Sequence, residues 1–214
     1  MANRVHCIGG RNGIQRPNGD RFMSLERSEK LIGMIRQLAL PDAAAISASC
    51  SSRLMPALLR YLEGERDIAR QALFTRAQEA IWLFAGGNPI SQSDLAHLAE
   101  ATFAAIPTDE ESVHAAEPYA EDAAAAICYG LRLCASGDIT NAIWASQRIF
   151  DALDHYYICG EYPDPEYAVQ KAWDIEADGQ VGDISDLNKL VGTLGREDAI
   201  QIFRLKSRPL PFVR

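Results

Sequence analysis

The sequence predicts an all-α protein that folds as a compact single-domain bundle of seven or eight helices. Alanine, the best helix former, is abundant, whereas Val and Thr, which favour strands, are sparse. Apolar residues recur three and four positions apart along most of the chain, and no run alternates as a strand would. A length of 214 residues with 48% hydrophobic content fits one domain with its own core.

The chain divides by composition into three parts. Residues 1–22 are polar and Gly-rich with little periodicity, and we expect them to form an irregular basic arm. Residues 23–208 carry the helical periodicity and should form the domain. Residues 209–214 contain two prolines and should form an extended tail.

The first half of the domain should contain four helices. The first begins after Ser24 and ends at Leu40, and the second begins at Asp42 as its N-cap and runs to about Leu62. Pro56 should kink the second helix or split it in two. A third helix is expected over about 65–84, and a fourth begins at Ser91, in a sequence that resembles a capping box, and ends before Pro107.

The second half begins with the clearest pair of helices. A fifth helix over about 118–135 and a sixth over about 139–157 are separated by a tight Ser-Gly-Asp connection, which favours antiparallel neighbours. A short helix over 166–176, a loop over 178–183 and a last helix over about 186–206 should follow. Gly192 and Gly195 are expected to interrupt that last helix.

Charge is distributed unevenly along the chain. Residues 109–186 hold seventeen acidic residues against three basic ones, a net charge of −14, while residues 1–27 have a net charge of +3. An acidic stretch of this kind excludes nucleic acid as its partner, since phosphate binding needs positive charge. It fits a basic protein partner, although any single acidic residue can serve solubility alone.

Tyrosines and carboxylates alternate over residues 151–167, which is the composition of a recognition surface. The alternative is that these tyrosines are half-buried residues at helix ends. The candidate partner-binding residues are Asp151, Asp154, Tyr157, Glu161, Tyr162, Asp164, Glu117 and Glu121.

No catalytic motif stands out, and we expect no catalytic residue, no metal and no cofactor. Asp151, His155 and Cys159 are spaced to share one helical face, which would permit a metal site, but no second pair of ligands accompanies them. Neighbouring carboxylates leave an acid/base site open as an alternative. The five cysteines form no CxxC pair and are expected to be reduced, mostly buried thiols.

No apolar run is long enough for a transmembrane helix, and the N-terminal residues lack the apolar region of a signal peptide. The sequence therefore predicts a cytoplasmic protein that does not bind membranes.

Several short motifs resemble the uncharacterised bacterial domain-of-unknown-function family 416, the YjaG-like proteins. They are spread over residues 30–176 and consist of Ala48-x-Cys50-x-x-Arg53-x-x-Pro56 with Tyr61, Ile106-Pro107-Thr108, Asp122 in an alanine-rich helix, and Trp173-Asp174-Ile175. The resemblance implies an all-helical cytoplasmic domain and brings no established reaction.

Three functions remain open from the sequence. The leading hypothesis is a non-catalytic protein-binding protein, specifically an immunity protein that neutralises a cognate bacterial toxin through an acidic surface. The second is a housekeeping or regulatory helical protein that acts as a homodimer or higher homo-oligomer. The third is an enzyme with a helical metal or acid/base site.

Overall fold

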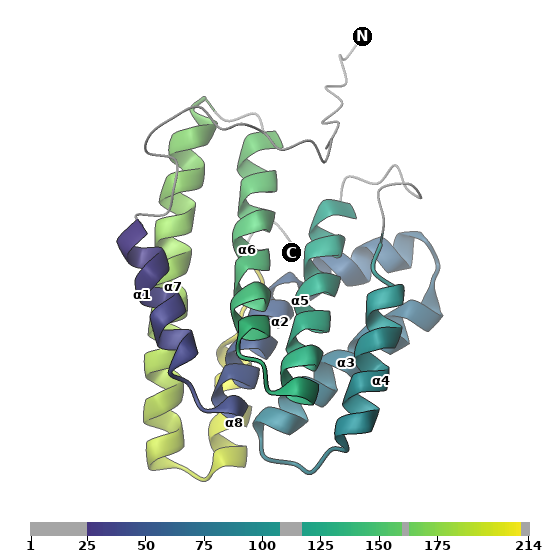
Figure 1. Cartoon of the computed structure of the whole chain (residues 1–214). Coiled ribbons are helices and arrows are strands. Elements are labelled where there is room, and N and C mark those ends of the chain that lie inside the picture. Colours follow the sequence, from purple (N-terminus) through teal and green to yellow (C-terminus); the bar gives the residue numbers. More distant parts are fainter. Residues whose placement is uncertain (1–24, 108–116, 160–162, 211–214) are drawn as a thin grey trace.

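Helices account for nearly all of the computed structural model, which describes residues 25–107, 117–159 and 163–210. Within these ranges there are eight helices and no strand, so the predicted all-α bundle is confirmed (Figure 1). The helices are α1 (Leu25–Arg36), α2 (Leu40–Gly64), α3 (Ile68–Ala85), α4 (Gln92–Ala104), α5 (Glu117–Ser136), α6 (Thr140–Cys159), α7 (Pro165–Thr193) and α8 (Arg196–Lys206). The expected arm and most of the expected tail lie outside the described residues.

The longest helix of the first half, α2, is the centre of the bundle. It packs against α3, α5, α6 and α7, and it lies behind the α5–α6 pair in Figure 1. Its first half is a run of small residues in which every side chain from Ala43 to Ser51 is buried. Small side chains let neighbouring helices approach closely, which explains why so many helices can contact this one segment.

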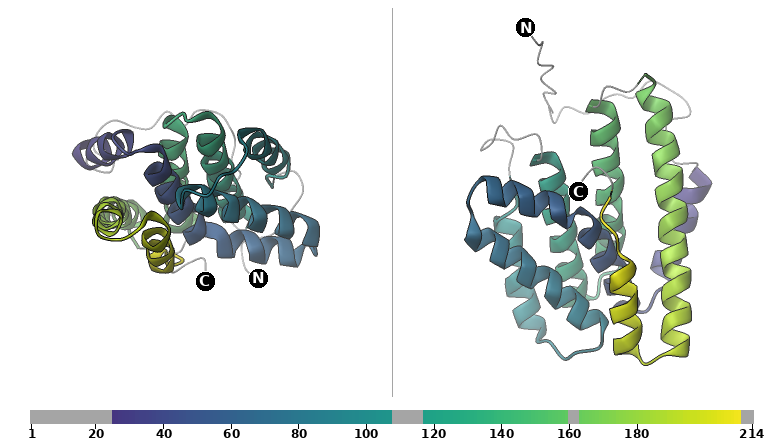
Figure 2. Two further views of the ribbon diagram at one scale, coloured as in Figure 1. Left: turned by 90° about the horizontal axis from the view of Figure 1, so that it is seen from below. Right: turned by 180° about the vertical axis from the view of Figure 1, so that it is seen from behind.

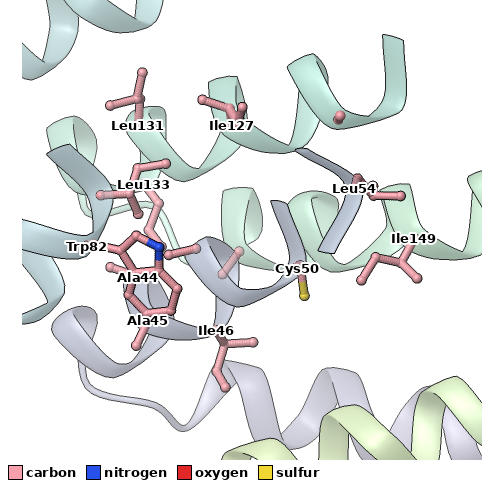
Figure 3. Close-up of a cluster of buried hydrophobic side chains, with 14 of the residues drawn as sticks. Ala44, Ala45, Ile46, Cys50, Leu54, Trp82, Ile127, Leu131, Leu133 and Ile149 are labelled. Atoms are coloured by element: carbon pink, nitrogen blue, oxygen red, sulfur yellow. The ribbon is translucent and has the colours of Figure 1, made fainter. Parts of the chain in front are cut away.

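Large apolar side chains fill the space between these helices. Leu54 on α2, Trp82 on α3, and Ile127 and Leu131 on α5 belong to one continuous cluster of buried residues (Figure 3). The burial of such side chains removes apolar surface from water and is the main source of stability in a bundle of this size.

The start of α2 differs from the sequence prediction, and one of the two effects expected of Pro56 is excluded. The helix begins at Leu40 with Ala39 as its N-cap, so Asp42 lies in the first turn, where its carboxylate binds Arg196 at 2.8 Å, rather than capping the helix. Pro56 does not split the helix, which continues to Gly64. The buried residues Leu54, Leu58 and Leu62 lie on both sides of Pro56, and their packing outweighs the cost of about 3 kcal/mol of a proline inside a helix.

The largest correction concerns residues 165–193, which form one helix. The prediction of a short helix over 166–176, a loop over 178–183 and a separate last helix from 186 was wrong. Ala177, Gln180, Ile184 and Leu187 are buried at helical spacing, and their packing holds Gly179 and Gly182 in the helix. The interruption expected near Gly195 is confirmed, because α7 ends at Thr193 and α8 begins at Arg196.

Candidate functional site

A cluster of charged side chains lies between α5 and α6. Gly137 has a φ of +75° in the short connection, which turns the chain so that the two helices run antiparallel (Figures 1 and 2). The first half of α5 therefore lies beside the second half of α6. We call the four carboxylates that meet there the acidic corner: Glu121 and Asp122 on α5, and Asp151 and Asp154 on α6.

The guanidinium of Arg148 connects two of these carboxylates, Asp122 and Asp151. Arg148 on α6 lies 3.4 Å from Asp122 through Nη1 and 2.5 Å from Asp151 through Nη2. Asp122 is buried, whereas the side chain of Asp151 is exposed. Arg148 thus joins a carboxylate inside the bundle to one on its surface.

The charges of the corner act on the buried carboxyl of Asp122. The pKa of Asp122 is raised well above its usual range, first by burial and then by the negative charge of Asp151, and Arg148 opposes this rise. Glu121 and Asp154 raise the pKa of Asp122 further. The four carboxylates therefore lie close enough together to influence one another.

The structure brings together three of the predicted partner-binding residues, Glu121, Asp151 and Asp154. Tyr157 is half-buried against the core, and its ring meets that of Tyr156 edge-on at 5.0 Å, as expected for a tyrosine near a helix end. Asp164 caps α7, accepting a hydrogen bond from the backbone N–H of Tyr167 at 3.0 Å. Glu161, Tyr162 and the side chain of Glu117 lie outside the described residues.

The residues considered for a metal site have other contacts. Asp151 pairs with Arg148, and the ring of His155 meets that of Tyr119 edge-on at 5.4 Å. The side chain of Cys159 lies outside the described residues. In the ranges that the structure covers, no three His, Cys, Asp or Glu side chains are placed to hold one metal ion.

A buried polar network that sequence reasoning missed joins α2, α6 and α7. Arg53 on α2 donates to both carboxylate oxygens of Glu176 on α7, at 2.7 and 2.5 Å. Glu176 accepts from Gln180 at 2.9 Å, and Gln180 accepts from the hydroxyl of Ser146 on α6 at 2.5 Å. Burial raises the pKa of Glu176 even though Arg53 opposes it. Each partner of this network has its hydrogen bonds inside the protein, so we interpret it as a structural connection.

The fold resembles that of one solved family of proteins. A solved structure of a DUF416 family protein from Shewanella baltica OS155 has a similar fold, with a TM-score of 0.64. The match covers 82% of this chain and 92% of that chain at 12% sequence identity. No protein-family model matches the sequence, and no curated protein matches it. The family resemblance seen in the sequence is therefore confirmed as a likeness of fold.

Two of the segments that carry the family resemblance meet in the buried network. Arg53 belongs to the motif that contains Cys50 and Pro56, and Glu176 directly follows Trp173-Asp174-Ile175. The indole N–H of Trp173 also donates to the backbone carbonyl of Phe150 on α6 at 3.3 Å. These segments thus connect α7 to the rest of the bundle.

Sequence reasoning also missed an aromatic cluster at the other end of the α5–α6 pair, which we define as Phe103, Tyr129, Arg132 and Trp144. The rings of Tyr129 and Trp144 lie 5.3 Å apart, and the guanidinium of Arg132 lies 4.6 Å from the ring centroid of Phe103. Phe103 and Trp144 are 53% and 42% exposed. The spacing of Tyr129 and Arg132 in the sequence places them on one helical face. It does not show whether that face is exposed or buried.

Proposed function

We propose that this chain is a non-catalytic protein-binding protein of the cytoplasm, and that its acidic corner binds a basic partner. The observation that carries the proposal is the gathering of Glu121, Asp122, Asp151 and Asp154 on two adjacent helices, within a stretch of sequence with a net charge of −14. An acidic stretch of this kind speeds the association of an oppositely charged protein and disfavours wrong partners. The same charge disfavours nucleic acid.

The partner class that we propose is a bacterial toxin domain, so that the chain acts as an immunity protein. A protein of this class needs no chemistry of its own, because it neutralises the toxin by covering its surface. Two features support the proposal: a net charge of −14 over residues 109–186 and the placement of part of that charge on two adjacent helices. Among the described helices, none is long and apolar enough to cross a membrane.

The first test is capture of the partner from the native cell, followed by mass spectrometry at low and high salt. We expect one stoichiometric basic protein whose gene lies beside that of this chain and whose expression alone inhibits growth. Co-expression of this chain should restore growth. Recovery of this chain by itself, or only with further copies of itself, would contradict the proposal and favour a homo-oligomeric role.

Charge reversal then tests the site. The triple variant E121K/D151K/D154K should slow association with the captured partner by about tenfold or more at low salt. The matched control is E29K/E63K/D94K, which changes net charge by the same amount at exposed positions away from the acidic corner. An association rate reduced equally in both variants would indicate an effect of net charge alone and would remove the acidic corner as the site.

A further inference from the structure

The four residues that follow α8 lie against the centre of α2. Residues 207–210 have no regular secondary structure and continue beyond α8 along the bundle (Figure 2). The hydroxyl of Ser207 donates to that of Ser49 at 2.9 Å. The backbone N–H of Leu210 donates to the carbonyl of Arg53 at 3.2 Å. The segment therefore follows α2 for about one turn, and we call residues 207–210 the C-terminal strap.

The strap is anchored through its last residue. Leu210 is buried and belongs to the apolar core, as does Phe203 in the last turn of α8. Arg208 is exposed, and Ser207 and Pro209 are half-buried. Because burial of a leucine removes more apolar surface from water than the other residues of the strap can, Leu210 should hold the strap in place.

The strap meets α2 beside its proline. Pro56 has no backbone N–H, so the carbonyl of Ser52, four positions earlier, cannot accept from it as it would in a regular helix. Leu210 bonds to the next carbonyl, that of Arg53. A donor from the end of the chain thus supports a turn of α2 that the proline weakens.

The same turn of α2 carries a buried thiol and one half of the buried ion pair. Cys50 lies between Ser49 and Arg53, the two residues that the strap contacts. Burial raises the pKa of Cys50, the charge of Arg53 lowers it and that of Glu176 raises it, so the thiol lies near the ion pair. The strap therefore lies along the part of α2 that keeps these groups from solvent.

We infer that the C-terminal strap controls access to the centre of the bundle: its release opens the turn of α2 from Ser49 to Arg53 to solvent while the other helices stay folded. A segment at the end of a chain can leave its place without moving the elements before it, and such local openings cost less free energy than global unfolding. The inference is independent of the partner proposed above. A protein that drew the strap away would expose the interior at this point.

The test measures how fast iodoacetamide labels Cys50 in the folded chain at a series of low urea concentrations. Cys134 on α5, also buried, is the internal reference. We expect the variant L210A to label at Cys50 about tenfold or more faster than the wild type, because loss of a buried leucine weakens the strap. Labelling of Cys50 should depend weakly on urea, since a local opening exposes little surface. Labelling of Cys134 should be slower than that of Cys50 and rise steeply with urea.

The control variant is R208A, which shortens an exposed side chain of the strap and should leave the labelling of Cys50 at the wild-type rate. A chain that ends at Lys206 lacks the strap and a chain that ends at Leu210 retains it, so Cys50 should be labelled rapidly only in the shorter one. Circular dichroism establishes that each variant is folded.

Two results would overturn the inference. The first is equal labelling of Cys50 and Cys134 in L210A with the same steep dependence on urea, because both thiols would then react only through global unfolding. The second is full protection of Cys50 in a folded chain that ends at Lys206.

Discussion

Arg53 and Glu176, which lie on α2 and α7, form a two-pronged ion pair inside the bundle. Their side chains are 16% and 5% exposed, and both guanidinium NH₂ groups donate to the carboxylate. The carboxylate accepts a further hydrogen bond from Gln180. A buried pair with complete hydrogen bonding is stable while intact, but loss of one partner leaves a charge that water cannot reach.

We predict that R53A lowers the free energy of unfolding by about 3–5 kcal/mol, because it leaves Glu176 buried without its cation. The apolar double variant R53M/E176L should recover most of this loss, since it removes both charges together. Urea denaturation measures all three proteins. The control is K206A, which breaks a surface pair with Asp186 and should cost less than about 1 kcal/mol. A similar small loss for R53A would contradict a structural role for the pair.

The glycines of α7 provide a second prediction. A Cβ atom added at Gly179 or Gly182 would meet nothing within 4 Å, and both residues lie inside the helix. Each change to alanine should therefore stabilise the protein by about 0.5–1 kcal/mol, because glycine has the greater freedom in the unfolded chain. Thermal denaturation should show a higher midpoint for G179A and G182A.

G137A is the matched control for these substitutions. Gly137 has a φ of +75°, a conformation that costs other residues about 1–2 kcal/mol, so alanine should destabilise the protein there. If G179A and G182A destabilised the protein as much as G137A does, α7 would need glycine at these two positions for a reason other than the space around them.

These glycines also explain where sequence prediction failed. Helices α3 to α6 were predicted within about three residues because their apolar spacing and their ending signals agree. In α7 the local sequence favours a turn, and only the burial of Ala177, Gln180 and Ile184 against other helices makes it helical. Such burial depends on residues far away in the chain and cannot be read locally.

The candidate site, too, was predicted from the sequence only in part. The excess of acid over residues 109–186 was visible in the sequence, and helical spacing alone places Asp151 and Asp154 on one face of α6. The meeting of Asp122 with Arg148 depends on how α5 packs against α6, and the pairing of Arg53 with Glu176 spans 123 positions of sequence. Pairings of this range are set by tertiary packing, so sequence patterns did not predict them.

The buried cysteines should be chemically inert in the folded protein. Burial raises the pKa of Cys134 to about 12 and also raises that of Cys50, so few thiolates form at neutral pH. We predict that iodoacetamide leaves both unmodified in the native state and labels both in guanidinium, with the sites assigned by mass spectrometry. Rapid labelling of Cys50 without denaturant would show that α2 opens locally.

Asp122 should make stability depend on pH in a direction opposite to that of most carboxylates. Because burial and the nearby carboxylates raise its pKa in the folded state, the folded protein holds this proton to a higher pH than the unfolded chain does. Between the unfolded value of about 3.9 and the raised folded value, the contribution of Asp122 to the free energy of unfolding falls as pH rises.

The variant D122N removes this titration, so its stability relative to the wild type should improve as pH rises from about 4 to 8. Denaturation at a series of pH values measures the difference.

D67N is the control of opposite sign: hydrogen bonds from the backbone and side chain of Arg70 lower the pKa of Asp67, so its stabilising contribution is present above about pH 3.9 and is lost as pH falls. D67N should therefore lose stability relative to the wild type as pH rises towards about 4 and differ little in pH dependence above it, so the pH series must extend below about 4. The prediction fails if the stability difference between D122N and the wild type is constant with pH while that of D67N changes as expected. Asp122 would then titrate alike in the folded and unfolded states, because Arg148 would balance the effect of its burial completely.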